Sequence, residues 1–471
     1  MKVLLIYPPR HHIITSGLPK LVEEDVGTYP PLGLLYLAAH LRRFSDHEVS
    51  VLDCQVENLA YEAVEAEVRR RSPDLVGITV LTLMLYDAVE TARRVKSVSR
   101  EIHVTLGGPH TSIYPRETAL LEPVDSVVIG EGERVFTDLV EAVARRRELS
   151  TVKGIAYRRE GEVVMTPPAD PITDLDTLPP IDRTMLPLKK YRSLVDVGKL
   201  STTMISSRGC PGRCIFCDVP YKVFRPRSPG LVVDEMEECV RLGIGEVYFY
   251  DDAFNLRKDR VLELCRTIAE RKLPVRWAFR GRVTPFDEEM AAALREAGCV
   301  RIQFGVESGS EDILRTMRKA IDLGDVRRAF RIAHQFGIAT VAYFMIAFPG
   351  ETREHVLRTI EFAKEIAPDY PVFCVTVPFP GTELYRLGLE RGVLSHDFWL
   401  DHATRPTPAL EPELWTEHLT VEEIRDLLRK AYRRFYFRPS YIAREFAKIR
   451  SVRELLRKAS GSLRMARDSF L

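Results

Sequence analysis

The 471-residue sequence lacks the features of a membrane-spanning or secreted protein. No run of apolar residues reaches the ~20 that are needed to cross a bilayer. The N-terminal segment MKVLLIYPPR is too short, and too soon interrupted by prolines, to be a signal peptide, so it is predicted to be a strand. We therefore expect a cytoplasmic protein.

Cysteines are also few, with eight in the whole chain. Five of them lie far apart in the sequence, which is typical of small core residues rather than of disulfide partners. These five are Cys54, Cys239, Cys265, Cys299 and Cys374. A reducing compartment fits this usage.

A large net charge is missing, because 68 Lys and Arg residues balance 67 Asp and Glu residues. The balance hides a basic segment: Arg425 to Asp468 holds 14 basic and 4 acidic residues, against 54 and 63 in the remainder. In one interpretation its apolar residues pack on the preceding domain; in the other its cationic face meets an anionic membrane or substrate. The apolar residues at helical spacing are Leu428, Ala431, Tyr432 and Phe435, followed after Pro439 by Tyr441, Ile442, Phe446 and Ile449. No nucleic-acid partner is expected.

Residues 1–145 alternate continuous apolar strands with helical patterns, which indicates a doubly wound parallel α/β domain. Ligands of such domains bind beyond the carboxyl ends of the strands. Residues 146–199 are rich in proline and aspartate without a sustained period, and are predicted to form a linker.

From residue 200 the alternation restarts with six strands up to residue 394, which predicts a partial βα barrel with six βα units rather than eight. Residues 395–471 are predicted to be a separate, mostly helical basic region.

Directly after the first of these six strands stands SSRGCPGRCIFCDVP, residues 206–220, with Cys210, Cys214 and Cys217 spaced CxxxCxxC. A structural zinc site requires four ligands, and a set of disulfides requires an even number of cysteines. No fourth cysteine or histidine is nearby in the sequence. Three thiolates suit an iron–sulfur cluster with one open iron. The open iron could chelate a ligand that carries an amine and a carboxylate, as S-adenosylmethionine does. A zinc knuckle is the alternative.

This motif, with Phe216 before its third cysteine and six βα units after it, resembles the radical S-adenosylmethionine enzymes. The resemblance implies a four-iron four-sulfur (4Fe-4S) cluster on the three cysteines. It also implies cleavage of S-adenosylmethionine to methionine and a 5′-deoxyadenosyl radical, with an external flavodoxin- or ferredoxin-like electron donor.

Other segments resemble the binding segments of that family for S-adenosylmethionine. YFYDDAF stands where the methionine amino group is held, although the usual Gly-Gly-Glu is absent; WAFRGRV offers an arginine for the carboxylate. FGVESGS and IAFPGET resemble the segments that face the adenosine and pack the adenine. The cofactor-binding residues that the resemblance implies are Tyr250, Asp251, Asp252, Arg280 or Arg282, Glu307, Ser308 and Gly350. An Asp-Asp helix cap and an ordinary Pro-Gly turn remain the alternatives for two of these segments.

A doubly wound domain before such a barrel resembles the cobalamin-dependent subclass, and the likeness covers about residues 1–395. The implied slot for the tail of cobalamin is lined by strand-end residues, all of which could instead form simple turns. They are Thr79, Leu81, Gly107, Gly108, Gly130, Glu131 and Gly132. The Asp-x-His-x-x-Gly motif that places a histidine below cobalt is not present, although His11 and His12 lie in the corresponding loop. No cobalt ligand is therefore expected from that motif.

Two enzymatic functions follow from the resemblance. The first is methylation of an unactivated carbon, or of phosphorus, in a small-molecule, lipid or tetrapyrrole substrate, with cobalamin carrying the methyl group. The alternative is a cyclase or carbon–carbon bond-forming enzyme of the same architecture that does not methylate. A carrier or sensor without enzymatic activity fits poorly with six intact βα units.

Overall fold

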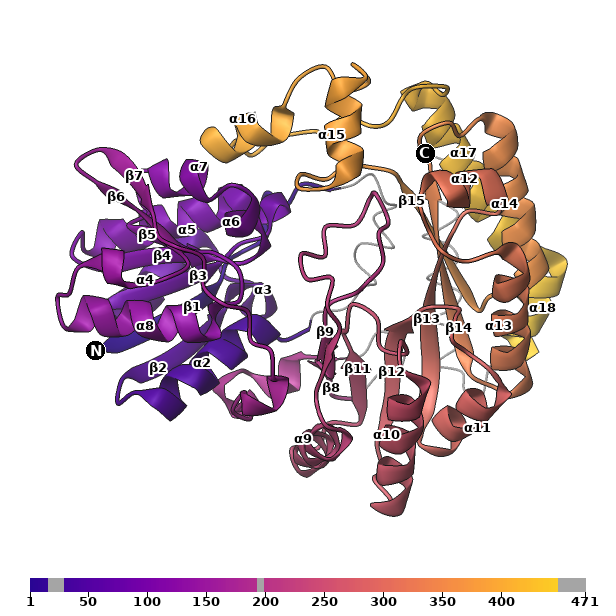
Figure 1. The fold of residues 1–471 in the computed structure, drawn as a ribbon, viewed down its shortest axis with the longest axis horizontal. Helices are drawn as coiled ribbons and strands as arrows, with labels where there is room; N and C mark the ends of the chain where they lie inside the picture. Colours follow the sequence, from indigo (N-terminus) through magenta and orange to yellow (C-terminus); the bar gives the residue numbers. More distant parts are fainter. Residues whose placement is uncertain (16–28, 193–198, 448–471) are drawn as a thin grey trace. The chain divides into compact units, whose positions relative to one another are not determined.

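The computed structural model describes residues 1–15, 29–192 and 199–447. These residues form two compact units. Of the described residues, the first unit contains Met1–Thr15, 29–192 and His396–Pro412, and the second contains 199–395 and 413–447. Each unit is built on its own sheet (Figure 1).

The first unit has a seven-stranded sheet in the order β2-β1-β3-β4-β5-β6-β7. Its first five strands are parallel, and β6 and β7 are added antiparallel at the edge. The order 2-1-3-4-5 is that of flavodoxin-like doubly wound domains. The strands are β1 (Lys2–Tyr7), β2 (Glu48–Asp53), β3 (Leu75–Thr79), β4 (His103–Gly107), β5 (Ser126–Val128), β6 (Ile155–Arg159) and β7 (Glu162–Met165).

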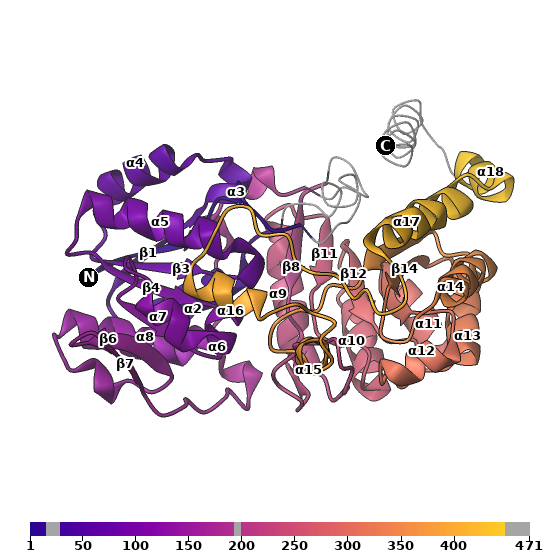
Figure 2. The same ribbon diagram turned by 90° about the horizontal axis from the view of Figure 1, so that it is seen from above.

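Helices cover both faces of this sheet because its central strands are apolar on both sides (Figure 2). Leu4 and Ile6 of β1 share a buried cluster with side chains of α4 and α5. On the opposite face, Leu5 and Phe136 of α8 fill the space beside Gly77. The helices are α2 (Leu32–Phe44), α3 (Cys54–Glu57), α4 (Tyr61–Arg71), α5 (Leu85–Val98), α6 (Pro109–Ile113), α7 (Pro115–Leu120), α8 (Gly132–Ala144) and α16 (Phe398–Thr404).

The second unit has a six-stranded, all-parallel sheet in the order β15-β14-β13-β12-β11-β8, which confirms the predicted six βα units. A two-stranded antiparallel ribbon follows its first strand. The strands are β8 (Ser201–Met204), β9 (Ser207–Arg208), β10 (Arg225–Pro226), β11 (Glu246–Phe249), β12 (Arg276–Gly281), β13 (Cys299–Glu307), β14 (Ala339–Ile346) and β15 (Tyr370–Val375).

Helices line the outer side of this sheet (Figure 1). They are α9 (Pro229–Arg241), α10 (Lys258–Glu270), α11 (Glu288–Glu296), α13 (Leu323–Gln335), α14 (Arg353–Ile366), α17 (Val421–Tyr436) and α18 (Pro439–Ala447). The phenylalanines of the strands are buried with the apolar faces of these helices, so the core of the unit lies between sheet and helices. Two further helices, α12 (Glu311–Thr316) and α15 (Glu383–Glu390), pack in a separate buried cluster with Ile215.

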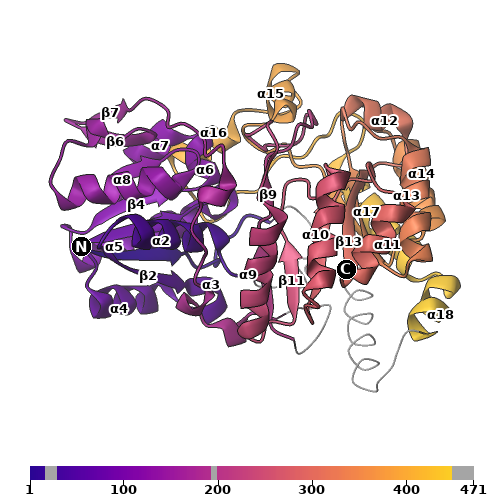
Figure 3. The same cartoon turned by 60° about the horizontal axis from the view of Figure 1, so that its bottom comes forward.

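The structure differs from the predicted linker over residues 146–199. Strands β6 and β7 lie in this range and extend the first sheet beside α7 (Figure 3). Two short strands carry too few residues to show a periodic pattern against the surrounding prolines. The predicted C-terminal region, 395–471, is likewise divided, because α16 packs on α7 of the first unit whereas α17 packs on β15 and α14 of the second.

The first half of the apolar stripe of the basic segment, on α17, is buried, as one of the two interpretations predicted, whereas Ile442 of the second half is 40% exposed. Leu428, Ala431, Tyr432 and Phe435 of α17 join the core of the second unit. The Tyr432 hydroxyl donates to the carbonyl oxygen of Phe373 in β15 at 3.1 Å. The side chain of Phe446 and all of Ile449 lie outside the described residues.

Candidate functional site

The three-cysteine loop is closed at its base by the β9–β10 ribbon, in which Arg208 pairs with Arg225. Gly209 has φ +88°, and a Cβ there would lie 2.1 Å from the carbonyl oxygen of Val223. Only glycine fits this backbone. The next amide, Cys210 N, donates to the Tyr221 carbonyl oxygen at 3.0 Å. The loop therefore turns sharply where the first cysteine begins.

Contacts with neighbouring βα units hold the middle of the loop. The Ile215 amide donates to the Met317 carbonyl oxygen at 3.2 Å, and the Leu384 amide donates to the Ile215 carbonyl oxygen at 2.8 Å. The Phe216 ring lies edge-on to Phe348, with ring centroids 6.0 Å apart. Phe216 thus anchors the loop to apolar residues. Only the part of its ring that does not contact Phe348 could contact a ligand.

Cys210, Cys214 and Cys217 are half-exposed free thiols, whereas Cys54, Cys239, Cys265 and Cys299 are buried. Burial raises the pKa of the Cys214 and Cys217 thiols, so thiolates are expected to form as metal binds. Within residues 1–15, 29–192 and 199–447, no three His, Cys, Asp or Glu side chains converge on one metal ion. A four-iron cluster needs no such convergence, because each thiolate binds its own iron.

The aspartate pair after β11 positions this loop. The Asp251 carboxylate is 2% exposed and accepts hydrogen bonds from the Ser206 amide (2.7 Å) and hydroxyl (2.6 Å) and from the Ser207 hydroxyl (2.5 Å). Burial raises the pKa of Asp251. Asp252 accepts from the Gly209 amide at 2.7 Å. Asp251, for which a contact with the methionine amino group was predicted, therefore fixes the segment that joins β8 to β9. Asp252 remains exposed beside the cysteine loop.

Arg280 lies within a set of aromatic side chains. Its guanidinium carbon is 3.9 Å from the centroid of the Tyr250 ring. Its Nη2 donates to the Tyr250 hydroxyl at 2.8 Å, and its Nε donates to the Tyr248 hydroxyl at 2.9 Å. The ring of Tyr250 is 42% exposed. Stacking on one face and two hydrogen bonds orient the planar guanidinium, which suits the recognition of a carboxylate.

Glu307 ends β13 in the left-handed region, with φ +68°. Its carboxylate pairs with Lys319 at 2.7 Å, and both side chains are nearly buried. A Cβ on Gly305 would lie 2.4 Å from Glu307 Oε1, so the glycine makes room for this pair. Ser308 is buried against Thr359 of α14, with 3.3 Å between the hydroxyls. Glu307 and Lys319 are close enough to Cys214 to act on the pKa of its thiol, whereas Ser308 is buried in the core.

The turn after β14 places Gly350 at φ +73°, exposed, with its amide donating to Glu417 Oε2 at 2.9 Å. Glu351 is buried and accepts from the Ala347 amide at 2.7 Å. Burial raises the pKa of Glu351 to about 7. This buried carboxyl holds the turn of the IAFPGET segment from beneath.

In the first unit, Thr79 of β3 and Gly107 of β4 are register partners at the carboxyl ends of their strands. Gly77 lies two residues before Thr79 in β3, on the same face of the sheet. A Cβ on Gly77 would meet Leu5 at 2.8 Å and Phe136 at 3.1 Å. A Cβ on Gly107 would meet only Val128, at 3.6 Å. Side chains therefore fill the sheet face at Gly77 and leave room for a ligand beside Gly107.

The remaining predicted glycines are explained by the backbone conformation or by close packing of helices. Gly108 has φ +125°, and a Cβ there would lie 2.7 Å from the Val80 carbonyl oxygen. Gly130 has φ +79°, and its amide donates to the Ser112 hydroxyl at 3.0 Å. A Cβ on Gly132 would lie 3.0 Å from Leu37, so this glycine lets α8 approach α2. Glu131 accepts from the Ile172 amide at 2.8 Å.

Two large apolar side chains are exposed at the carboxyl edge of the first sheet. Leu81, after β3, is 41% exposed, and Ile13, after β1, is 40% exposed. The Ile14 amide donates to the Leu83 carbonyl oxygen at 3.0 Å and holds the two loops together. An apolar surface at the switch point of a doubly wound sheet suits a flat, largely apolar cofactor.

Comparisons with known proteins agree with this geometry. Residues 204–363 match the family model "Radical SAM superfamily", and residues 20–140 match "B12 binding domain". The chain is 36% identical over 468 residues to "Uncharacterized methyltransferase PH0819" of Pyrococcus horikoshii, which covers 97% of this chain and 98% of the relative. The chain belongs to the cobalamin-dependent radical S-adenosylmethionine enzymes. The cofactors of this family are a 4Fe-4S cluster, S-adenosylmethionine and cobalamin.

A second relative of this radical enzyme bears on the choice of reaction. The "anaerobic magnesium-protoporphyrin IX monomethyl ester cyclase" of Rubrivivax gelatinosus is 30% identical over 466 residues, which covers 97% of this chain and 81% of the relative. Methyltransferases and cyclases thus share this architecture.

The fold is also that of a solved structure. The cobalamin-dependent S-adenosylmethionine radical enzyme OxsB, with aqua-cobalamin and S-adenosylmethionine bound, superposes with a TM-score of 0.75 at 17% identity, covering 100% of this chain and 72% of OxsB. This likeness confirms the predicted fold class of a doubly wound domain followed by a radical S-adenosylmethionine barrel.

The structure adds residues that the sequence did not indicate. Lys319 lies twelve residues beyond its partner Glu307, and Tyr248 lies beneath Arg280. The alternation in the segment EVYFYDD places Tyr248 of β11 and Tyr250, directly after it, on the same side of the chain, and could have indicated that Tyr248 lies beside Arg280. Within the described ranges, no helix is long and apolar enough to cross a membrane.

Proposed function

We propose that this enzyme transfers a methyl group from S-adenosylmethionine, by way of cobalamin, to an unactivated carbon or phosphorus of a small-molecule, lipid or tetrapyrrole substrate. The observation that carries the proposal is the full-length similarity to a relative named as a methyltransferase. The open sheet face beside Thr79 and Gly107 supports it, because a domain that carries methyl groups on cobalamin must hold the cofactor.

When bound, the cluster supplies the electron that cleaves S-adenosylmethionine, and cobalamin carries the methyl group. Cys210, Cys214 and Cys217 hold three irons as thiolates. We assign Tyr250, Asp252 and Arg280 to the methionine portion of S-adenosylmethionine, since the Arg280 guanidinium is already oriented for a carboxylate. Glu307 and the exposed backbone at Gly350 face the adenosine. Ser308 and Asp251 act as positioning residues, because both are buried.

A flavodoxin- or ferredoxin-like protein supplies the electron. That electron breaks the bond between sulfur and the 5′-carbon and leaves methionine and the 5′-deoxyadenosyl radical. The radical takes a hydrogen atom from the substrate and becomes 5′-deoxyadenosine. A second molecule of S-adenosylmethionine would supply the methyl group by way of cobalamin and leave as S-adenosylhomocysteine. The methyl group would pass from cobalamin to the substrate radical, and the same external donor would return the electron that cobalamin then needs for the next methyl transfer.

The alternative is a radical cyclase without methyl transfer, which the similarity to the Rubrivivax gelatinosus enzyme supports. S-adenosylmethionine with a deuterated methyl group separates the two functions. After incubation with a metabolite extract and a low-potential reductant, a methyltransferase yields a product that has gained the labelled methyl. A cyclase yields a product that has lost hydrogen and carries no label.

Peripheral contact with an anionic membrane is part of the proposal. Although the apolar stripe of α17 is buried, its outer face presents Arg425 and Arg429. Phe437, directly after α17, is 45% exposed, and Ile442 of α18 is 40% exposed. Basic side chains close to apolar ones suit the interface of an anionic bilayer.

Flotation with liposomes tests this contact. Replacing Arg425 and Arg429 with glutamate is expected to weaken co-flotation with anionic vesicles, by ~1 kcal/mol for each lost basic residue, most clearly at low salt. Replacing Phe437 and Ile442 with serine should weaken it at every salt concentration. If the parent protein and both variants float equally, or if none of the three floats, this face does not bind the membrane.

A further inference from the structure

Arg282 follows β12 directly and lies against the cysteine loop. A Cβ on Gly212 of that loop would lie 3.5 Å from Arg282 Nη1 and 3.3 Å from Cys210 Sγ. The absence of a side chain at Gly212 therefore lets the guanidinium and the first thiol approach the same point. Arg282 Nη2 also donates to the Ala320 carbonyl oxygen at 3.4 Å. The side chain thus lies between the cysteine loop and the segment that precedes α13.

The backbone of Arg282 is held by a buried side chain. Its amide donates to Asn255 Oδ1 at 2.8 Å, and Asn255 Nδ2 donates to the Arg282 carbonyl oxygen at 2.8 Å. The same Nδ2 donates to the Pro285 carbonyl oxygen at 2.9 Å, and Asn255 is fully buried. The point from which the arginine side chain starts is therefore fixed relative to the sheet.

Two cations act on the Cys214 thiol, and their charges are compensated differently. Burial raises the pKa of this thiol, Lys319 and Arg282 lower it, and Glu307 adds to the rise. Lys319 pairs with Glu307 at 2.7 Å, so these two charges largely cancel. Within the part of the chain that the structure describes, no carboxylate pairs with Arg282. A guanidinium stays protonated in proteins, so the surroundings of the thiols keep an uncompensated positive charge.

We infer that Arg282 raises the reduction potential of the 4Fe-4S cluster; this inference rests on the proposed function, which assigns the cluster to Cys210, Cys214 and Cys217. The cluster takes one electron from the flavodoxin- or ferredoxin-like donor and becomes more negative by one charge. A fixed positive charge beside it stabilises the reduced form more than the oxidised form. Charge around a cluster and hydrogen bonds to its sulfurs are the means by which a protein sets this potential.

The two arginines of WAFRGRV then have different partners, although the sequence offered both for the carboxylate of S-adenosylmethionine. Arg280 is stacked on Tyr250 and hydrogen-bonded to Tyr248 and Tyr250, which orients it for that carboxylate. Arg282 lies beside the thiol of Cys210 instead. Its positive charge therefore acts on the cluster whether or not S-adenosylmethionine is bound.

A reductive titration followed by electron paramagnetic resonance tests the inference without a measurement of activity. The reconstituted full chain is poised at a series of potentials in the absence of S-adenosylmethionine, and the signal of the reduced cluster is recorded. In Arg282→Gln the ratio of reduced to oxidised cluster at a fixed potential is expected to fall about tenfold, which is ~59 mV for one electron. Arg282→Lys keeps the charge and should stay close to the parent protein. A parent-like potential in Arg282→Gln, or equal shifts in both variants, overturns the inference.

Arg318→Gln is the matched control, because it removes the same charge from a neighbouring segment. The Arg318 guanidinium donates two hydrogen bonds to the Glu383 carboxylate, at 2.7 and 2.8 Å, so its charge is already compensated. This variant should shift the potential less than Arg282→Gln does, and an equal or larger shift overturns the inference. A shift in Arg282→Gln that appears only after S-adenosylmethionine is added would assign Arg282 to the carboxylate of that ligand, which also overturns it.

Iron content separates this inference from the cluster assignment. If the parent protein holds no reducible cluster after reconstitution, or if Cys214→Ala keeps one, the assignment in the proposed function fails. A cluster whose potential does not respond to Arg282→Gln refutes this inference alone. If Arg282→Gln assembles no cluster, Arg282→Met takes its place as an uncharged side chain of similar length. If no neutral variant assembles the cluster, Arg282 is needed for assembly rather than for the potential, and the inference is overturned.

Discussion

Replacing Cys214 with alanine is expected to abolish the cleavage of S-adenosylmethionine to 5′-deoxyadenosine. Loss of a partner behind a metal ligand already costs ~10–100-fold in metal affinity or activity, so loss of the ligand should cost more than about a hundredfold. Chromatography of the nucleoside products, after anaerobic reconstitution with iron and sulfide, measures the effect. The iron content of the variant should fall in parallel.

Cys265→Ala is the matched control, since this cysteine is buried in the core of the same unit. It should lose some stability and keep its cluster and its cleavage activity. Full cleavage by the Cys214→Ala protein would contradict the cluster assignment. Loss of activity in both variants with normal iron content would also contradict it, because Cys214 would then be no more important for holding the cluster than the core residue Cys265.

Replacing Gly107 with phenylalanine is expected to release cobalamin and leave the cluster in place. Only Val128 approaches the position of a Cβ at residue 107, so a larger side chain would occupy the space that is left for the cofactor tail. Overpacking costs ~1–3 kcal/mol. That is about a five- to 150-fold loss of affinity. Absorbance after desalting follows cobalamin and the iron–sulfur cluster separately.

Gly107→Ala is the control, because its methyl group would lie at an ordinary 3.6 Å from Val128. It should bind cobalamin as the parent protein does. Gly108 gives no such test, since any side chain there meets the Val80 backbone and strains the chain itself. Normal cobalamin retention by Gly107→Phe would place the tail elsewhere.

The strands of both sheets could be predicted from the sequence because buried parallel strands are continuous apolar runs. Strands β6 and β7 could not, since they are short, β7 lies at the edge of the sheet without a buried residue, and a proline-rich stretch follows them. The return of α16 to the first unit is a long-range contact that no local pattern encodes.

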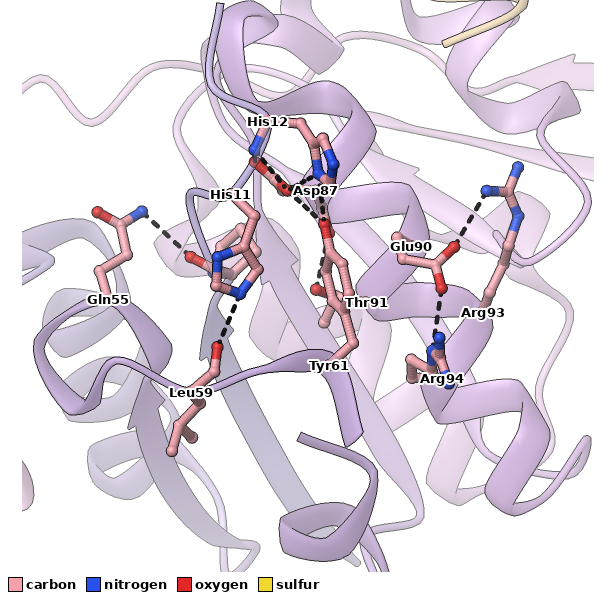
Figure 4. A network of polar contacts seen from close by, with 11 residues as sticks. His11, His12, Gln55, Leu59, Tyr61, Asp87, Glu90, Thr91, Arg93 and Arg94 are labelled. Carbon is pink, nitrogen blue, oxygen red and sulfur yellow. Dashed lines mark hydrogen bonds and ion pairs between the residues drawn. The ribbon is translucent and has the colours of Figure 1, made fainter. Parts of the chain in front are cut away.

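The cysteine motif could likewise be predicted from its spacing, whereas the contacts around it could not. Asp251 has the residue type of a ligand contact, but only the fold shows that it is buried on Ser206 and Ser207, more than forty positions earlier in the chain. In the first unit, His12 Nδ1 lies 3.2 Å from Oδ1 of Asp87, although 75 positions separate the two residues in the chain (Figure 4). Such pairs form where loops meet at the edge of a sheet. A local sequence pattern predicts the loops but does not show which of them meet.

The central claim is that this chain moves the methyl group of S-adenosylmethionine through its cobalamin domain. The most direct test supplies the anaerobically reconstituted protein with cobalamin, a low-potential reductant and S-adenosylmethionine with a deuterated methyl group, and analyses the cofactor and nucleosides by mass spectrometry. Labelled methyl is expected on the bound cobalamin, together with S-adenosylhomocysteine. Formation of 5′-deoxyadenosine alone, with all the label left in methionine, would contradict methyl transfer and leave a radical enzyme that does not methylate.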